Sequence, residues 1–389
     1  MNNFTYYNPT RLVFGQGTEK TAGKEIRQLL GQMGRVALVY GGGSIKRTGL
    51  YDRVKASLAE EGMSVVELGG VTVNPTIEFV RDGLAQLRDN PPDAVLAVGG
   101  GSVMDAAKAI AAGLCYEGDV WDFFDGTTVP KKALPIVCIP TQPATGSEQS
   151  IRSVITNGDT KTGMGNEFIR PKVAIINPEL YMTLPPYQIG AALVDMMSHI
   201  MERYFSATEH TSYVDWQAEA ALRCAMRYGL KVIENPQDYD SWCQIAMVGT
   251  FAHNGYFGLG RVEDWACHAI EHELSAWNPA ITHGAGLAVV IPAWMSHVSA
   301  VHPERFVRFA IRVMGVEPQA SDKETIALGI AKLCGFYIKI GMPISLAELD
   351  ATNCPVESLA EHCTRKGPVG HLMELDAKDV VAILASAAG

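Results

Sequence analysis

The sequence predicts an α/β domain built around a parallel sheet, followed by an all-helical domain. In the first half of the chain, short apolar runs rich in β-branched residues alternate with helix-like stretches. Beyond residue 187, apolar residues recur at helical spacing and β-rich runs nearly vanish. Pro185 and Pro186 mark the change between these two patterns. We therefore expect one domain at 1–186 and the other at 187–389.

The expected strands are apolar runs that end in glycine or small polar residues. In order, they lie at 35–40, 63–68, 93–98, 135–139 and 173–176, with helix-like stretches at 48–62, 75–88 and 103–113. Apolar strands that alternate with helices form a parallel sheet covered on both faces. Residues 11–14 are expected to form an edge strand able to pair with a second subunit, which predicts a homodimer.

The second domain is expected to consist of helices alone. Helical periodicity covers 189–206, 210–234, 240–257, 261–275, 285–300, 303–313, 321–339, 355–364 and 376–387. No run approaches the roughly 18 apolar residues that a membrane span requires. The best, 287–295, is half that length and contains Pro292.

Composition excludes several classes of protein. The chain has 389 residues, of which 47% are hydrophobic and 19% charged, so it is globular rather than disordered. Its net charge of −10 disfavours a nucleic acid partner, because binding phosphates needs a basic surface. The start lacks the basic and apolar regions of a secretory signal, and none of the eight cysteines forms a C-x-x-C pair. We expect a cytoplasmic protein with reduced cysteines and no membrane or nucleic acid partner.

Glycine-rich loops follow two of the expected strands. Residues 41–44 and 99–102 both read Gly-Gly-Gly-Ser, and the second loop opens a helix. Glycines let backbone N–H groups approach phosphate oxygens, and a helix N-terminus favours negative charge. A third loop, 140–148, also follows a strand and supplies hydroxyl groups. Together these loops predict a Rossmann-like dinucleotide-binding domain, although their spacing matches neither G-x-G-x-x-G nor a Walker A loop.

The loop at 41–44 favours NADP(H) as the nucleotide. Enzymes that select NAD usually place a carboxylate against the ribose 2′-hydroxyl. Here Lys46 and Arg47 follow the loop, and no carboxylate stands there to repel a 2′-phosphate. NAD(H) stays the alternative; in that case Lys46 and Arg47 are solvated and contact no phosphate.

Candidate metal ligands lie in the helical domain. Asp195 and His199 are four residues apart, so they share one face of a helix. His268 and His283, from a second helix and a following turn, can complete the shell. One oxygen and three nitrogens suit Zn²⁺ or Fe²⁺ better than Ca²⁺ or Mg²⁺. Since an Asp/His pair alone is a common surface feature, this expectation depends on its combination with the nucleotide loops.

The motifs together resemble a known family. They are GGGS-x-x-D-x-x-K at 99–108, ATGSE at 144–148, D-x-x-x-H at 195–199, and H-x-x-x-H at 268–272 with His-Gly at 283–284. Over essentially the whole chain they resemble the iron-containing (group III) alcohol dehydrogenases. The segment Y-G-G-G-S-I-K at 40–46 looks most similar to the NADPH-dependent butanol dehydrogenase and broad-range aldehyde reductase branch. The resemblance implies an alcohol dehydrogenase or aldehyde reductase with the two-domain fold of dehydroquinate synthase.

The resemblance also implies roles for individual residues. Asp195, His199, His268 and His283 match the family's metal ligands. His272, one helical turn after His268, would relay a proton or orient cofactor and substrate, unless it is a plain structural residue. The implied cofactor-binding residues are Gly42, Gly43, Ser44, Gly100, Gly101, Ser102, Asp105, Thr141, Thr145, Ser147 and Lys161.

Three other functions compete with this interpretation. A glycerol-type, NAD-dependent polyol dehydrogenase and a dehydroquinate synthase-like lyase share the two-domain plan. The lyase needs a cluster of cations for its phosphorylated substrate, whereas only Arg203 and Arg261 lie near the candidate ligands in sequence. An inactive metal-binding scaffold is the third, and retention of all four ligands and both glycine loops argues against it.

Overall fold

The computed structural model describes residues 1–389, and the chain separates into two compact units. One unit comprises Tyr7–Thr183, and the other comprises Met1–Tyr6 together with Leu184–Gly389. The sequence pattern had placed residues 1–6 with the α/β domain. They lie with the helical unit because the backbone N–H of Asn2 donates to the carbonyl oxygen of Gly260 over 2.7 Å.

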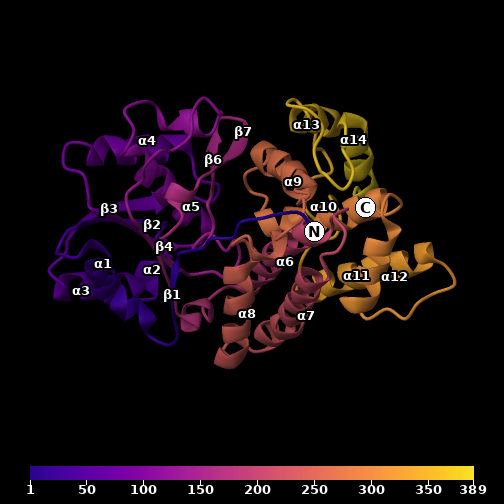
Figure 1. The fold of residues 1–389 in the computed structure, drawn as a ribbon, viewed down its shortest axis with the longest axis horizontal. Helices are drawn as coiled ribbons and strands as arrows, with labels where there is room; N and C mark the ends of the chain where they lie inside the picture. Colours follow the sequence, from indigo (N-terminus) through magenta and orange to yellow (C-terminus); the bar gives the residue numbers. More distant parts are fainter. The chain divides into compact units, whose positions relative to one another are not determined.

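The first unit is built on a six-stranded sheet in which every neighbouring pair is parallel (Figure 1). This confirms the parallel sheet predicted from the apolar runs. In spatial order its strands are β1 (Arg11–Phe14), β8 (Val173–Ile176), β5 (Ile136–Pro140), β4 (Ala94–Gly99), β2 (Arg35–Gly41) and β3 (Ser64–Val71). Strand β1 forms one edge, as expected.

Helices cover both faces of this sheet. Side chains alternate along a strand, so Val36 and Leu38 of β2 face one side while Ala37 and Val39 face the other. The first side packs against α1 (Ala22–Leu30), the short α2 (Ser44–Arg47) and α3 (Leu50–Glu60). The second side packs against α4 (Ile77–Leu87) and α5 (Gly101–Gly113). The unit therefore has the doubly covered, Rossmann-like arrangement.

After β5 comes an antiparallel hairpin, which the sequence pattern did not predict. It pairs β6 (Arg152–Asn157) with β7 (Thr160–Gly165) through a turn at Gly158, whose φ is 59°. Most of its side chains are polar, and Ile155 and Met164 are the apolar residues that it buries in the core. This short polar alternation lacks the apolar run by which the other strands are recognised.

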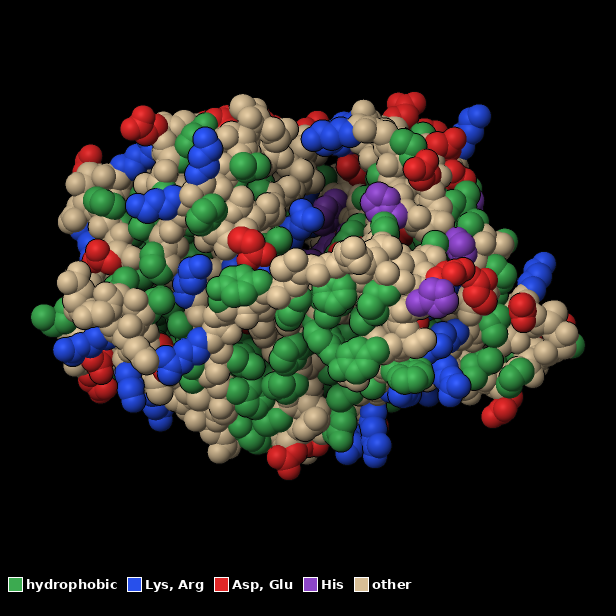
Figure 2. Space-filling model, in the orientation of Figure 1, with side chains coloured by type: hydrophobic (Ala, Val, Ile, Leu, Met, Phe, Trp, Pro, Cys, Tyr) green, Lys and Arg blue, Asp and Glu red, His purple; other side chains and the backbone are tan.

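The second unit is helical throughout, as predicted. Its helices are α6 (Pro186–Tyr204), α7 (Ser212–Glu234), α8 (Tyr239–Ala252), α9 (Ala266–Trp277), α10 (His283–Val298), α11 (Pro303–Arg312), α12 (Asp322–Lys339), α13 (Val356–Cys363) and α14 (Ala377–Ser386). None of the helices in the chain combines the length and the apolar character needed to cross a bilayer. Figure 2 shows hydrophobic side chains gathered over α7 and α8; the large exposed ones on these helices are Tyr213, Trp216 and Met247.

Helix α9 begins five residues later than its periodicity predicts. Trp265 has a φ of 72°, a left-handed conformation that a helix cannot contain. The Asp264 carboxylate accepts a hydrogen bond from the backbone N–H of Ala266 over 3.0 Å. This carboxylate satisfies one of the N–H groups that a helix start leaves without an intrahelical partner.

Helix α6 forms the centre of the helical unit. Every residue from Ile189 to Tyr204 is buried, polar ones included. Its backbone is approached closely by α10 at Gly284, and its Leu193 fills the space left by Gly229 of α7. Polar side chains on such a helix lie in a dry environment, so they need defined partners.

Candidate metal centre and nucleotide-binding loops

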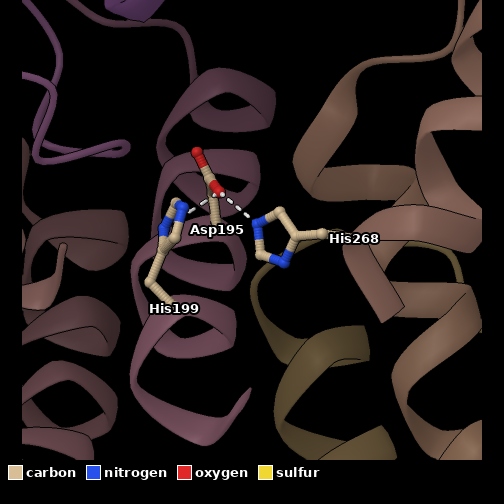
Figure 3. Close-up of side chains that lie close together, drawn as sticks. All are labelled: Asp195, His199 and His268. Atoms are coloured by element: carbon tan, nitrogen blue, oxygen red, sulfur yellow. Dashed lines mark ion pairs between the residues drawn. The ribbon is translucent and has the colours of Figure 1, made fainter. Parts of the chain in front are cut away.

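Three of the candidate metal ligands converge from two helices (Figure 3). Asp195 and His199 are one turn apart on α6, and His268 faces them from α9. Asp195 Oδ1 lies 3.4 Å from His199 Nδ1 and 3.9 Å from His268 Nε2. All three side chains are buried.

The fourth candidate, His283, is the first residue of α10. Its Nε2 lies 3.8 Å from Asp195 Oδ1. It does not belong to the set of Asp195, His199 and His268, whose ligand atoms all lie within 4.8 Å of one another. A second such set combines His283 with Glu271 and His272. Asp195 Oδ1 is thus the common neighbour of three imidazole nitrogens.

The donor atoms fit a divalent transition metal. A tetrahedral ion with bonds of about 2.0–2.1 Å places its ligand atoms about 3.4 Å apart. The distances from Asp195 Oδ1 to the three nitrogens, 3.4, 3.9 and 3.8 Å, are close to this value. His199 Nδ1 and His268 Nε2 are buried and have no hydrogen-bond partner. Buried polar atoms of this kind are costly, and an ion that accepts their lone pairs would relieve the cost.

The surroundings affect the two buried histidines differently. Burial holds the pKa of His199 well below its usual value, and the neighbouring His268 adds to this effect. Burial also opposes protonation of His268, but the charge and hydrogen bond of Glu202 outweigh it and raise the pKa of His268. His199 is therefore neutral at physiological pH, the form in which imidazole binds a metal.

Two carboxylates that the sequence did not single out contact the candidate ligands. Glu202 of α6 pairs with His268 Nδ1, and Glu271 of α9 pairs with His283 Nδ1. Helical spacing offered a signal for Glu202, which is seven residues after Asp195 and so shares its face. No comparable spacing connects Glu271 with His283, because they lie on different helices.

Other side chains surround the cluster. His272, half-buried on α9, has its ring centroid 5.5 Å from that of His283 and 6.3 Å from that of His268. The His253 ring lies 4.3 Å from the His199 ring, so His253, which the sequence did not single out as a site residue, lies beside the centre. Arg203 donates to the carbonyl oxygen of His199 over 2.7 Å and lies within 3.1 Å of His253 Nδ1.

The predicted nucleotide loops follow three neighbouring strands. Residues 42–44, 100–102 and 141–147 come directly after β2, β4 and β5, whose carboxyl ends meet at one edge of the parallel sheet. Open α/β sheets bind their ligands at this edge. The N-terminus of α5, at Gly100, has no side-chain cap, which leaves its N–H groups suited to an anion.

Close packing connects two of these loops. A Cβ added at Gly101 would lie 2.5 Å from Thr145 Cγ2, so glycine is required there for the loops to meet. The Thr141 N–H donates to the carbonyl oxygen of Gly99 over 3.0 Å. Gly43, with a φ of 113°, makes the turn before Ser44.

Two predicted cofactor residues, the buried Ser147 and the half-buried Asp105, belong to a network with the buried Lys108. Ser147 Oγ donates to Asp105 Oδ1 over 2.9 Å, and Lys108 Nζ donates to Ser147 Oγ over 2.7 Å. Burial raises the pKa of Asp105 and lowers that of Lys108, while each group's charge opposes the shift of the other. The charge of Lys161, on β7, also acts on Asp105. Asp105 and Ser147 therefore hold the α5 start to the 141–147 loop.

Comparison with known families assigns the chain. The model "Iron-containing alcohol dehydrogenase" matches residues 9–178, and "Fe-containing alcohol dehydrogenase family, C-terminal" matches residues 190–388. The chain belongs to the iron-containing alcohol dehydrogenase family. This confirms the resemblance drawn from the motifs and makes the protein an oxidoreductase that acts on alcohols.

Individual members of the family are similar over nearly their full length. A probable NADH-dependent butanol dehydrogenase 1 of Bacillus subtilis is 42% identical, with 99% of each chain covered. The NADPH-dependent aldehyde reductase YqhD of Escherichia coli is 34% identical, with 97% of each covered. The crystal structure of an NADH-dependent butanol dehydrogenase A from Thermotoga maritima matches with a TM-score of 0.96 at 40% identity, covering 100% of this chain and 99% of that one.

Proposed function

We propose that this alcohol dehydrogenase is a metal-dependent, NADP(H)-linked enzyme that interconverts small aldehydes and alcohols. Asp195, His199, His268 and His283 would hold one divalent ion, either Fe²⁺ or Zn²⁺. The observation that carries this proposal is the convergence of three imidazole nitrogens on Asp195 Oδ1.

The chemistry divides between the bound groups and the chain. When bound, the metal would supply a Lewis acid for the substrate oxygen, and the nicotinamide would supply or accept hydride. The chain's own residues hold these groups and move a proton. We assign to His272 the delivery or removal of the proton at the substrate oxygen, or the orientation of the substrate. Its half-buried position beside His283 supports this assignment.

The three loops at the strand ends would bind the nucleotide. We assign this role to Gly42, Gly43, Ser44, Gly100, Gly101, Ser102, Thr141 and Thr145, with Asp105, Ser147 and Lys161 beside them. Backbone N–H groups of the glycines and of the α5 start would contact the phosphates. The names of the relatives do not identify the nucleotide that this chain uses, because one relative is called NADH-dependent and another NADPH-dependent.

The preference for NADP(H) is supported by Lys46. Its Nζ lies 5.0 Å from the Tyr40 ring centroid and 4.9 Å from that of Tyr51, close enough for cation–π attraction to hold it. Glu67, the carboxylate near these rings, accepts hydrogen bonds from Tyr51 and Lys55. A fixed cation two residues after Ser44 favours a 2′-phosphate.

We also propose a homodimer. Strand β1 is paired with β8 on one side and forms the outer edge of the sheet on the other. An exposed strand edge can pair with a second copy of the same strand. Light scattering of the purified protein tests this: a monomer mass would contradict it.

The function is tested by steady-state kinetics with a short aliphatic aldehyde. We expect NADPH oxidation coupled to aldehyde loss in equal amounts, and a higher kcat/KM for NADPH than for NADH. A preference for NADH would overturn the nucleotide assignment alone. If neither nucleotide is oxidised although metal is bound, the dehydrogenase proposal fails and the scaffold or lyase alternatives gain support.

A further inference from the structure

Two buried carboxylates lie behind the histidines of the candidate metal centre. Glu202 accepts a hydrogen bond from His268 Nδ1, and Glu271 accepts one from His283 Nδ1. Their side chains are 1% and 0% exposed. Carboxylates this deeply buried are rare, because removing the charge from water is costly unless a partner compensates. Their partners here are two of the four proposed metal ligands.

Each carboxylate determines which nitrogen of its histidine is available. An ionised carboxylate only accepts hydrogen bonds, so the facing Nδ1 must carry the proton. The lone pair of the neutral ring then lies on Nε2. Nε2 is the nitrogen nearest Asp195 Oδ1 in both residues, at 3.9 Å for His268 and 3.8 Å for His283. Both lone pairs are therefore directed toward the oxygen of Asp195.

A second contact fixes the position of each carboxylate. Glu202 Oε1 also accepts from the backbone N–H of His268 over 3.2 Å. That N–H lies in the first turn of α9, where no intrahelical acceptor is available. Glu202 thus attaches the start of α9 to α6.

Glu271 is held in a comparable way. The hydroxyl group of Ser275 donates to its carboxylate. Gly286 of α10 leaves room for this side chain, since a Cβ added there would lie 2.8 Å from Glu271 Cγ. Glu271 therefore lies between α9 and α10, directly behind His283.

We propose that Glu202 and Glu271 are positioning residues of the metal centre. They hold His268 and His283 as Nε2 ligands, and with Asp195 they place three negative charges around a divalent cation. Carboxylates that accept from metal-bound histidines raise the basicity of the ring and strengthen metal binding. This inference depends on the proposed function, because it assumes that the four residues hold an ion.

The test measures metal affinity rather than turnover. The variants are Glu202→Gln and Glu271→Gln, each of which retains the shape and an acceptor oxygen but loses the charge. Metal-free protein is titrated with Zn²⁺ against a chromophoric chelator, and the visible spectrum of the Co²⁺ form is recorded. We expect the Kd for Zn²⁺ to rise about 10- to 100-fold in each variant. The Co²⁺ bands should shift as the ligand field changes.

Glu273→Gln is the matched control. Glu273 is also on α9 and its side chain is 12% exposed, but it pairs with His362 and Arg365 outside the candidate centre. Its Kd for Zn²⁺ should equal that of the wild type. If both Gln variants bind Zn²⁺ within twofold of the wild type, or if the control weakens binding equally, the inference is wrong.

Two further results keep the test decisive. If a Gln variant does not fold, Gly286→Ala displaces Glu271 without changing its charge, and we expect weaker Zn²⁺ binding there too; unchanged binding would overturn the role of Glu271. Failure of the wild type to bind Zn²⁺ or Fe²⁺ would instead reject the proposed function itself. Retention of metal by the wild type with unaltered affinity in the variants would reject only this inference.

Discussion

Gly284 contacts the backbone of Ala191 so closely that a Cβ added at Gly284 would lie 2.0 Å from the Ala191 carbonyl oxygen. The two residues lie next to the proposed ligands: His283 precedes Gly284, and Asp195 is one helical turn after Ala191. The approach of α10 to α6 at this point therefore determines how near His283 comes to Asp195. The His-Gly pair in the sequence thus has a physical reason, since only glycine permits the contact.

Gly284→Ala should separate the two helices and weaken the metal centre. Overpacking against a backbone atom costs about 1–3 kcal/mol, and His283 would move away with α10. We expect a lower Tm and a lower metal content by elemental analysis. Gly335→Ala is the control, because a Cβ added at Gly335 of α12 would have no atom within 4 Å other than its chain neighbours and the backbone of its own helix. Alanine there should be neutral or stabilising, and equal losses in both variants would contradict the account.

Lys108→Met should destabilise the α/β unit strongly. Lys108 is fully buried and donates to Ser147 Oγ and to the Arg152 carbonyl oxygen, and its charge opposes the raised pKa of the half-buried Asp105, so its removal leaves these acceptors without their donor. Leaving a buried acceptor unsatisfied in this way costs about 1–3 kcal/mol for each acceptor. Urea denaturation followed by fluorescence should show a lower midpoint. Lys55→Met, which breaks an ion pair that is about one-third exposed, should cost at most about 1 kcal/mol; a similar loss in both would refute the network's importance.

Lys46→Ala should change nucleotide preference. A charge-assisted hydrogen bond to a 2′-phosphate is worth about 1.5–3 kcal/mol, which corresponds to roughly a tenfold or larger rise in KM for NADPH. NADH lacks that phosphate, so its KM should change less than about twofold. Lys55→Ala serves as the control because Lys55 lies near the same Tyr51 ring, 5.8 Å from its centroid. Equal effects of Lys46→Ala on both nucleotides would count against NADP(H).

Much of the fold could be predicted because its signals are local. Buried parallel strands are apolar along their whole length, so β2, β4 and β5 stand out in the sequence, and the glycines after them mark the ligand edge. The β6–β7 hairpin was missed because its strands are mostly polar and bury only Ile155 and Met164. The start of α9 was misplaced because the left-handed conformation of Trp265 depends on contacts made by the folded chain.

Some residues of the candidate site could also be recognised from local sequence, whereas others depend on how the helices pack. Asp195 and His199 are visible as a pair because one helix turn separates them. Glu202 and Glu271 could not be assigned, because a carboxylate on a helix resembles a solvated residue until the partner helix is placed. The nearness of His283 to Asp195 also depends on the Gly284 contact, which is a property of the packed helices.

Lowering the pH should remove the stabilisation that the hydrogen bonds to Glu67 contribute to the folded chain. Hydrogen bonds from Lys55 and Tyr51 lower its pKa from 4.5 to about 2, so in this range the unfolded chain binds more protons than the folded one. The stabilisation is thus complete above pH 4.5 and is lost as the pH falls toward 2. Glu67→Gln should lower the urea midpoint at neutral pH, and the difference from wild type should shrink below pH 4.5. A difference that stays constant down to about pH 3 would contradict this assignment.

The most direct test of the central claim is removal and return of the metal in the wild-type enzyme. NADPH oxidation with a short aldehyde is followed before chelation, after chelation, and after addition of Zn²⁺ or Fe²⁺, with metal content measured at each step. We predict that activity disappears with the metal and returns with one of these two ions. Full activity in protein shown to be metal-free would contradict the role assigned to Asp195, His199, His268 and His283.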